Sequence, residues 1–233
     1  MFRTVVAATI LGLLAGCGAD GEPAPPSQST DFGYQVPEER RYEERWLPTD
    51  VIDFDTPDGT FVRAFLEAAT LTTYVGSRAA SYPGFDAALA PALAQGKALD
   101  TEPHLRPRHP AFGAKYWRLI SVVNEPGTVR VVGCYSSPGM PPWPETNPPS
   151  ETGGIVSGFL LVYERFGGKE PPTNQRGDRA VPYDSVFGSW HAVEYDPLYA
   201  ETNRDSVTPC LADAFDSNDT IEIGWPAGPQ PIA

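Results

Sequence analysis

The chain is poor in cysteine, methionine and basic side chains. Its 233 residues include three cysteines, two methionines, and 17 lysines and arginines against 30 aspartates and glutamates. Binding to nucleic acid needs a clustered basic footprint, and the sequence has no run of lysine and arginine. The apolar run at residues 5–14 is shorter than the roughly 20 residues that a membrane-spanning helix needs. These absences argue against a nucleic-acid-binding protein and against a transmembrane helix.

The sequence also lacks the common catalytic patterns. No glycine-rich phosphate-binding loop follows a predicted strand. In the segment at residues 154–158, Ser157 is misplaced for the G-x-S-x-G motif of serine hydrolases. His104 and His109 lie in a proline-rich stretch without a carboxylate or thiol at metal-ligand spacing. We therefore predict no metal site and no cofactor, with a weak site formed by these two imidazoles as the alternative.

What the chain does have is an N-terminal export signal. Arg3 precedes the apolar run, and small residues follow at positions 15 and 16, just before Cys17. A basic start, an apolar centre and small residues at the cleavage point are the three parts of a secretory signal peptide. The segment Leu14-Ala15-Gly16-Cys17 resembles the lipobox of bacterial lipoproteins. The resemblance implies cleavage after residue 16 and attachment of acyl chains such as palmitate to Cys17. The alternative is an ordinary signal peptide in which the next residue happens to be cysteine.

Lipid on Cys17 would hold the mature chain at the extracytoplasmic face of the cell membrane. Removal of residues 1–16 takes away Arg3 and no acid, so the formal charge changes from −13 to −14. A body of this charge does not adhere to anionic head groups, and attachment depends on the acyl chains. Residues 18–48 are rich in glycine, proline, serine and charge, which is typical of a linker. We predict a signal peptide at 1–16, the lipidated cysteine with a flexible tether at 17–48, and one globular domain at 49–233.

Cys134 and Cys210 remain once Cys17 is assigned to lipid. An even pair of cysteines in an oxidising compartment predicts a disulfide. A bridge that closes about 75 residues stabilises a fold by roughly 4 kcal/mol on the chain-entropy model. The alternatives are two buried thiols, or a reactive thiol at Cys210 behind the helix start Thr208-Pro209.

The clearest secondary-structure prediction is a helix that begins after Thr56. The segment Thr56-Pro57-Asp58 supplies an N-cap, a proline at the first helical position and an acid in the first turn. Gly76 is a natural C-terminal stop. A second helical stretch is predicted from about residue 81, and a proline inside it is expected to bend or end it. Its apolar residues recur at every fourth position: Phe85, Leu89 and Leu93.

The remainder of the chain predicts strands. Apolar, β-branched and aromatic runs occupy residues 115–123, 128–135, 154–166 and 186–195, with a short run at 220–225. Residues 124–127 have the turn chemistry of a hairpin with a four-residue loop. In the third run, both alternating sets of residues are apolar. This predicts a sheet covered on both faces, or one covered by a helix on one face and curled around a cavity on the other.

A helix followed by a curved antiparallel sheet of four or more strands resembles the element order of the NTF2-like, or cystatin-like, α+β folds. The resemblance spans roughly residues 56–195. It implies an N-terminal helix or helices packed on a cone-shaped sheet with long proline-rich loops. Proteins of that fold include small-molecule isomerases, hydratases and non-catalytic binding domains, so the fold does not decide the function. The composition, together with the lipobox, is similar to that of actinobacterial envelope lipoproteins.

His191 is the candidate acid–base residue. In the predicted strand it shares a face with Val193 and Tyr195, and it would act as a general base if that face lined a cavity. His191, Tyr195 and Arg118 are the weak candidates for ligand binding, with Arg118 suited to an anionic group. The structural alternatives are a hydrogen-bonded His191 in a half-buried strand and an Arg118 that pairs with an acid across the sheet.

These observations predict a lipid-anchored, extracytoplasmic binding or accessory protein of the bacterial envelope, with no evident catalytic chemistry. Its partners would be the membrane through Cys17, and an envelope protein or a small apolar ligand, but not nucleic acid. One alternative is a small-molecule enzyme with His191 lining its cavity. Another is a structural partner of a transport or wall-building complex that docks through the loop at residues 136–153, which carries Trp143.

Overall fold

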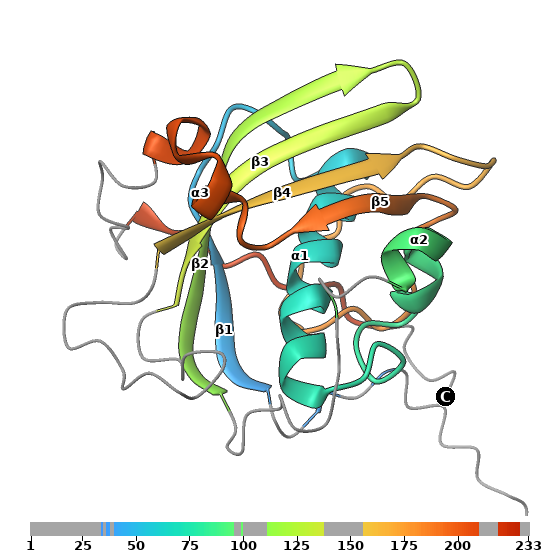
Figure 1. Ribbon diagram of the computed structural model, residues 1–233. Coiled ribbons are helices and arrows are strands. Elements are labelled where there is room, and N and C mark those ends of the chain that lie inside the picture. Colours follow the sequence, from blue (N-terminus) through green and yellow to red (C-terminus); the bar gives the residue numbers. More distant parts are fainter. Residues whose placement is uncertain are drawn as a thin grey trace, which may run out of the picture. The chain divides into compact units, whose positions relative to one another are not determined.

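A long helix packed against a curled sheet makes up the folded part of the chain (Figure 1). The structure is a computed structural model that describes residues 34, 36–37, 40–95, 99, 111–137, 156–209 and 219–228. All of these belong to one unit, Phe32–Ala233. The sheet has five strands of mixed direction and forms a half-barrel, so the predicted α+β class is confirmed. Among the described helices, none is long and apolar enough to cross a membrane.

The five strands follow one another across the sheet in the order β1-β2-β3-β4-β5. They are β1 (Arg40–Trp46), β2 (Ala111–Glu125), β3 (Thr128–Ser136), β4 (Val156–Glu164) and β5 (His191–Asp196). β1 is parallel to β2, whereas the other pairs are antiparallel. The prediction of an antiparallel sheet is therefore wrong at this edge. Parallel neighbours need a crossover connection, and here that connection contains α1 (Pro57–Val75).

β1 corrects the predicted boundary of the tether. The sequence predicts a flexible linker up to residue 48, but Arg40–Trp46 form the edge strand of the sheet. Tyr42, Glu44 and Trp46 are buried, while the residues between them are exposed or half-buried. This period of two is the pattern of a strand with one buried face. The folded unit therefore begins before residue 49.

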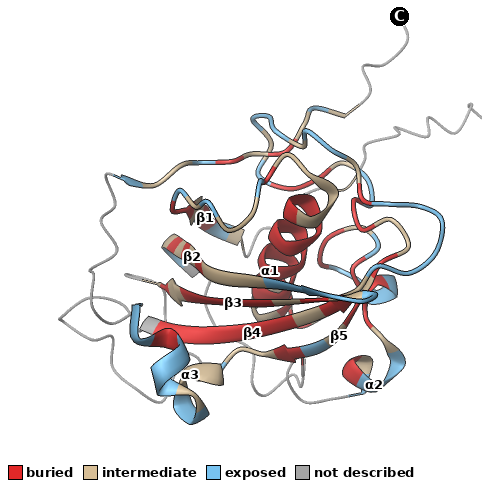
Figure 2. Cartoon of the chain, turned by 90° about the horizontal axis from the view of Figure 1, so that it is seen from above, coloured by how far each residue is buried: buried red, intermediate tan, exposed pale blue. Residues whose placement is uncertain are grey.

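α1 begins and ends as predicted. The side chain of Thr56 accepts a hydrogen bond from the Gly59 backbone N–H at 3.2 Å, and Pro57 is the first helical residue. Gly76 ends the helix in the left-handed conformation, with a φ of 64°. Buried residues run without a break from Gly59 to Thr72, so the helix is enclosed on every side (Figure 2).

The second predicted helix is broken into two short pieces. The 3-10 helix η1 covers Asp86–Ala88, and α2 covers Pro91–Ala94. Between them, Leu89 is extended and forms a parallel bridge with Ala192 of β5. The proline begins the second piece because its missing N–H and fixed φ suit the first turn of a helix.

β2 and β3 form the predicted hairpin with a tighter turn than expected. Glu125 pairs with Thr128, so the loop consists of Pro126 and Gly127 instead of four residues. Gly127 has a φ of 82°. Proline followed by a residue of positive φ is the centre of a type II turn.

Both faces of the sheet are covered, which is the first of the two predicted arrangements. One set of alternate residues in β4 joins the main core around α1: Phe159, Leu161 and Tyr163. The other set supplies Leu160 to a smaller cluster, the convex-face cluster, whose other buried members are Val132, Cys134 and Val207. Val207 belongs to the 3-10 helix η4 (Arg204–Val207), which follows α3 (Tyr199–Thr202). Figure 1 shows α3 on the outer side of the sheet.

The last two predicted strands are shorter than expected. β5 begins at His191 instead of residue 186. The segment at 220–225 makes single bridges in place of a regular strand: Ile221 with Trp46, Gly224 with Gly177, and Trp225 with Arg179. The bridge between Ile221 and Trp46 covers the outer edge of β1 at the last residue of that strand.

Candidate functional site

His191 lies on the outside of the sheet. A β-bulge in β5 leaves Val193 without a register partner, so the buried Ala192 and Tyr195 both join the core. His191 therefore faces the opposite side, where its Nε2 atom lies 3.2 Å from Oε2 of Glu164. The prediction that His191 and Tyr195 share a face is wrong because the bulge adds one residue between them.

Arg118 and Tyr195 lie on opposite faces of the sheet. Arg118 pairs in register with Cys134 of the convex-face cluster, and its Nη1 atom donates to the Pro209 carbonyl at 3.3 Å. Tyr195 is in the main core, where its ring meets that of Phe65 edge-on at 5.3 Å. Burial raises the pKa of Tyr195 far above its ordinary range, so its hydroxyl stays neutral. The three candidate residues from the sequence do not form one site.

Several predicted residues lie outside the part of the chain that the structure describes. These are Cys17, His104, His109, Trp143 and Cys210. Lipidation, the weak histidine site, the docking loop and the disulfide partner of Cys134 therefore stay predictions.

Two ionisable side chains that were not predicted to meet lie inside the half-barrel. Glu44 of β1 and Lys115 of β2 are opposite each other in the parallel register, and both are buried. Trp117 Nε1 donates to Glu44 Oε2 at 2.6 Å. Lys115 Nζ donates to Thr70 Oγ1 of α1 at 2.9 Å. Each charged group is thus anchored by a neutral partner from a neighbouring residue or element.

Two aromatic rings flank the Lys115 amine. Its Nζ atom lies 4.4 Å from the ring centroid of Trp117 and 4.1 Å from that of Tyr135. A cation within about 6 Å of an aromatic face is attracted by the ring quadrupole. Tyr135 is itself held by a 3.3 Å hydrogen bond from its hydroxyl to the Pro197 carbonyl. We call Glu44, Thr70, Lys115, Trp117 and Tyr135 together the interior polar site.

Burial shifts the pKa values of Glu44 and Lys115 toward each other. Removal from water disfavours the charged form of either group. It raises the pKa of Glu44 to about 8, and the negative charge of Glu67 acts in the same direction. It lowers the pKa of Lys115 to about 8, although the Glu44 carboxylate opposes this change. Perturbed titrations of this kind are common at functional sites.

Hydrogen bonding around Glu44 is incomplete within the described residues. Its Oε1 atom is buried and has no hydrogen-bond partner among the residues that the structure describes. Such an unpaired buried group costs about 1–3 kcal/mol. Groups of this kind are places where bound water or a ligand completes the bonding.

The sequence contains a signal for one half of this site. The alternation of Tyr42, Glu44 and Trp46 with outward-facing charged residues would place Glu44 inside a strand. No local pattern indicates the parallel register that brings Lys115 opposite to it.

A second buried carboxylate, Glu67 of α1, is fully hydrogen-bonded. It accepts bonds from Trp46 Nε1 at 3.1 Å, Tyr82 OH at 2.7 Å and Trp225 Nε1 at 2.9 Å. Arg63 lies one turn earlier in the helix, and its Nε atom is 3.9 Å from Oε1 of Glu67. The donors come from β1, from the loop before η1 and from the C-terminal segment. Glu67 therefore ties α1 to three separate parts of the fold and is not free for proton transfer.

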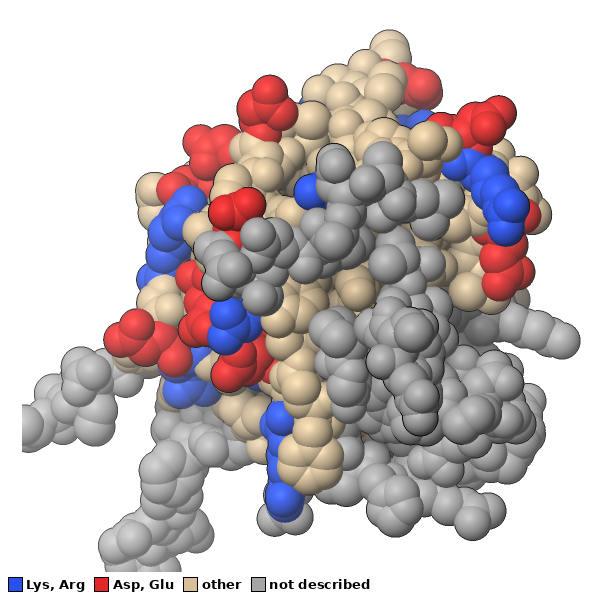
Figure 3. Space-filling model, turned by 90° about the vertical axis from the view of Figure 1, so that its left-hand side faces the viewer, with Lys and Arg blue, Asp and Glu red and all other residues tan. Residues whose placement is uncertain are grey.

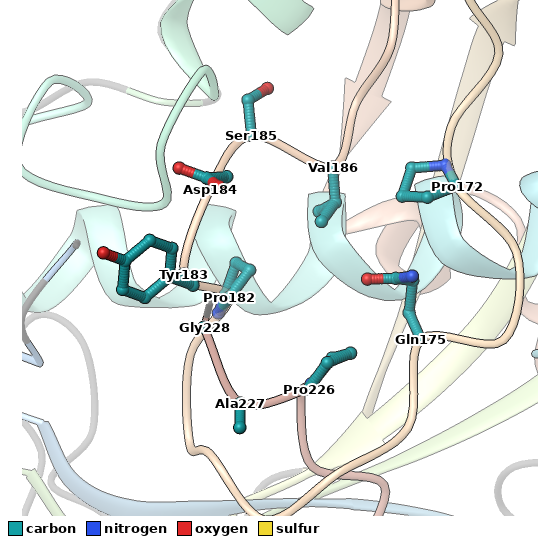
Figure 4. A pocket seen from close by; sticks show the side chains of 10 residues that line it. All are labelled: Pro172, Gln175, Pro182, Tyr183, Asp184, Ser185, Val186, Pro226, Ala227 and Gly228. Carbon is teal, nitrogen blue, oxygen red and sulfur yellow. The ribbon is translucent and has the colours of Figure 1, made fainter. Parts of the chain in front are cut away.

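An open pocket of about 180 Å³ lies among the surface loops (Figure 4). Two loop segments line it, and Figure 4 shows α1 passing behind them. The lining residues are Pro172, Gln175, residues 182–186 and residues 226–228. Asp184 is the one charged residue in this lining, so the pocket holds no acid–base pair. Among the described residues, no group of three or more His, Cys, Asp or Glu side chains could hold a metal ion.

The fold and its sites define a broad class, an α+β protein in which one buried helix fills a curled, five-stranded half-barrel. No protein-family model, curated protein or solved structure matches the chain. Its function must therefore be argued from its own residues.

Proposed function

We propose that the protein is a lipid-anchored binding or accessory protein of the bacterial envelope, held at the extracytoplasmic face of the cell membrane through Cys17. The export signal and lipobox at residues 1–17 support the anchoring. Its partners in this role are an envelope protein or a small apolar ligand.

The filled interior of the half-barrel is the observation that carries the binding role. Aromatic rings from the sheet pack directly on α1. The ring centroid of Tyr163 lies 4.6 Å from that of Phe61, and the ring centroid of Tyr195 lies 5.3 Å from that of Phe65. An enzyme or carrier that worked in the cone would need a concave pocket that encloses most of its ligand. Here side chains take up that space, and His191 lies on the outer face. This arrangement favours recognition at the outer surface.

Surface charge supports a partner other than nucleic acid. On the face shown in Figure 3, acidic and basic side chains of the described residues are interspersed. Arg45, for example, pairs with Glu43 at 2.6 Å and with Glu222 at 2.7 Å. With an overall formal charge of −13, the chain would repel a polyanion.

The finer description of the fold as an NTF2-like cone is part of the proposal. A helix that precedes a curved, mainly antiparallel sheet supports it. β1 departs from the predicted pattern, because it precedes the helix and adds a parallel edge strand to the sheet.

Detergent-phase partitioning tests the anchor. We expect Cys17→Ala in the full-length chain to move the protein from the detergent phase to the aqueous phase, because no acyl chain is attached. Cys134→Ala, which leaves the lipobox intact, is the matched control and should remain in the detergent phase. An intact Cys17→Ala chain that still partitions into detergent would refute lipid anchoring.

Purification from membranes, followed by native mass spectrometry, tests the binding role. A protein or apolar ligand retained in stoichiometric amount supports it. Loss of a retained protein in a Trp143→Ala variant would assign the docking to the loop that carries this residue. Recovery of the chain without any companion, together with turnover of a small molecule, would favour the enzyme alternative.

A further inference from the structure

We infer that the pocket of Figure 4, the loop pocket, docks a tyrosine side chain of a partner protein, with a lysine or arginine next to that tyrosine. The inference rests on the proposed binding role and deepens it, because it selects a protein as the partner and states which side chain is recognised. The loop pocket is open to the surface, so a side chain of another protein enters it directly from solvent.

The volume of the loop pocket fits one aromatic ring. It measures about 180 Å³, and an apolar cavity of about 150 Å³ is enough to hold benzene. Pockets that enclose most of a drug-sized ligand measure roughly 300–1,000 Å³. The loop pocket is therefore too small to enclose a carried ligand of that size. Among the side chains that most often anchor protein interfaces, tyrosine has one ring and tryptophan has two fused rings, so tyrosine fits this volume better.

Apolar groups form the walls of the loop pocket. Figure 4 shows the side chains of Pro172, Val186 and Pro226 pointing toward its centre, with α1 behind them. Proline rings and valine methyl groups present C–H bonds to the space between them. The face of an aromatic ring is negative and attracts the positive end of such bonds. These walls therefore suit the faces of a flat ring.

One polar side-chain atom, Oε1 of Gln175, points into this apolar space. In Figure 4 the oxygen of the amide group faces the cavity and the nitrogen lies on the other side. The nitrogen, Nε2, donates to the Thr173 carbonyl at 2.9 Å, which fixes the orientation of the amide group. Oε1 has no hydrogen-bond partner among the residues that the structure describes. An amide oxygen accepts a hydrogen bond from a phenolic hydroxyl, so the pocket favours tyrosine over phenylalanine.

The walls are held in place without a partner. The backbones of Arg179 and Trp225 exchange hydrogen bonds of 3.0 and 2.7 Å, which join the two loop segments that line the pocket. On the side of α1, Nη2 of the fully buried Arg63 donates to the backbone carbonyl of Gln175 at 2.6 Å. A preformed site loses little conformational freedom when it binds. The loop pocket therefore needs no rearrangement to receive a ring.

Asp184 at the rim indicates the charge of the partner. It is the one charged residue of the lining, and in Figure 4 its carboxylate points outward from the cavity. The exposed carboxylate forms no ion pair with the part of the chain that the structure describes. The overall formal charge of −13 acts in the same sense. A basic residue beside the docked tyrosine would meet Asp184, and an acidic residue there would be repelled.

Titration of the full-length, folded protein with acetylated, amidated tripeptides tests the inference, with backbone amide chemical shifts as the readout. Lys-Tyr-Lys at millimolar concentration should shift the resonances of residues 183–186 and 227–228. Lys-Ala-Lys has the same charge but no ring and should leave them unchanged. Lys-Phe-Lys should bind about twofold to tenfold more weakly than Lys-Tyr-Lys, because it lacks one hydrogen bond. Equal shifts with the tyrosine and alanine peptides, or shifts only outside the pocket lining, would overturn the inference.

Variants of Gln175 locate the docked ring. Gln175→Trp places a ring of the chain itself in the pocket and should abolish the shifts caused by Lys-Tyr-Lys. Thr173→Trp is the matched control, because it adds the same ring to the same loop at an exposed position outside the lining. Gln175→Met keeps the length of the side chain without the accepting oxygen, so the tyrosine and phenylalanine peptides should bind it equally. A preference for tyrosine that survives in Gln175→Met would overturn the role given to Gln175.

An exchange of charge tests the rim. Lys-Tyr-Lys should bind at least about threefold more tightly than Glu-Tyr-Glu at low salt, and added salt should reduce the difference. Asp184→Asn should also reduce it, because the variant removes the nearest carboxylate. A difference between the two peptides that is the same with and without Asp184 would assign the preference to the net charge of the chain and contradict a role for the rim.

Failure of this inference and failure of the proposed function give different results. The peptide titration reports on the loop pocket alone, whereas native mass spectrometry after purification from membranes reports on the binding role. A protein that stays bound in Gln175→Trp as well as in Thr173→Trp would support the binding role and overturn docking at the loop pocket. Specific binding of Lys-Tyr-Lys, with no protein retained from membranes, would support the loop pocket and contradict a stable envelope complex.

Discussion

At the scale of single residues, Glu67 is a buried group whose removal should cost several hydrogen bonds at once. Its carboxylate accepts three hydrogen bonds and neighbours Arg63. Removal of one member of a buried charged pair costs about 3–5 kcal/mol, so Glu67→Leu should lower the free energy of unfolding by about this amount. Glu67→Gln keeps one acceptor oxygen and should cost about 1–3 kcal/mol.

Urea unfolding of the purified domain measures both losses. Glu194→Gln, on the exposed side of β5, is the matched control and should change the free energy of unfolding by less than about 0.5 kcal/mol. A Glu67→Leu variant as stable as this control would show that the Glu67 network does not hold the fold together.

Glu44 gives the stability a dependence on pH. Its folded pKa, about 8, is raised above the ordinary value of 4.5. Its contribution to stability is therefore fully present below pH 4.5 and is lost as the pH rises through 8. Lys115 acts in the opposite sense, because its lowered pKa adds stability only as the pH rises above 8. We expect the free energy of unfolding to fall by a few kcal/mol between about pH 5 and pH 8.

Glu44→Gln is the control for this dependence. It leaves an acceptor for Trp117 but no titrating group, so most of the decline between pH 5 and pH 8 should disappear. Parallel declines in the variant and the unaltered protein, measured by urea unfolding at each pH, would exclude Glu44 as the cause.

A sequence reveals the chemical type of a candidate residue but not the direction in which its side chain points or the partners that bury it. His191 was found as a candidate because histidine is chemically distinctive, but a single bulged residue, Val193, turned it away from the core. Lys115 and Glu44 carry no such signal in the sequence, because charged residues are usually exposed. Their burial depends on partners such as Trp117, which is 73 residues from Glu44.

At the scale of elements, the β2–β3 turn isolates the effect of backbone conformation. Gly127 has a φ of 82°, and a Cβ atom added to it would meet nothing within 4 Å. Gly127→Ala should therefore lower the free energy of unfolding only through the left-handed conformation, by about 1–2 kcal/mol. Gly168→Ala, where a Cβ atom also meets nothing and no positive φ is required, should be nearly neutral. Equal melting temperatures for the two variants would show that the turn changes conformation at no cost.

The elements that were predicted correctly are those with local signals. The two ends of α1 were predictable because Thr56, Pro57 and Gly76 act on the backbone beside them. β1 was not, since its burial needs the distant strand β2. The helix expected around Phe85 failed for a similar reason, because Leu89 pairs with β5 instead of continuing the helix. Local chemistry determines helix ends, whereas pairing between distant segments determines strands and their register.

At the scale of the whole molecule, the predicted Cys134–Cys210 disulfide would join the sheet to the C-terminal part of the chain. Cys134 packs with Val207 in the convex-face cluster. Arg118, its register partner, donates to the carbonyl of Pro209 at 3.3 Å. Pro209 directly precedes Cys210, which lies outside the described residues. These contacts support the predicted pairing, because they place Pro209, the residue before Cys210, beside the strand that carries Cys134.

Mass mapping of a non-reduced digest should therefore find Cys134 linked to Cys210. Cys210→Ala isolates the stabilising effect of the bridge better than Cys134→Ala, because Cys134 also fills space in a buried cluster. Loss of a bridge that closes about 75 residues should lower the free energy of unfolding by roughly 2–4 kcal/mol. Cys17→Ala should leave the unfolding of the domain unchanged, since it alters only the anchor. Free thiols at both positions, in protein isolated from its envelope, would show that the contacts between the sheet and the C-terminal part form without the disulfide.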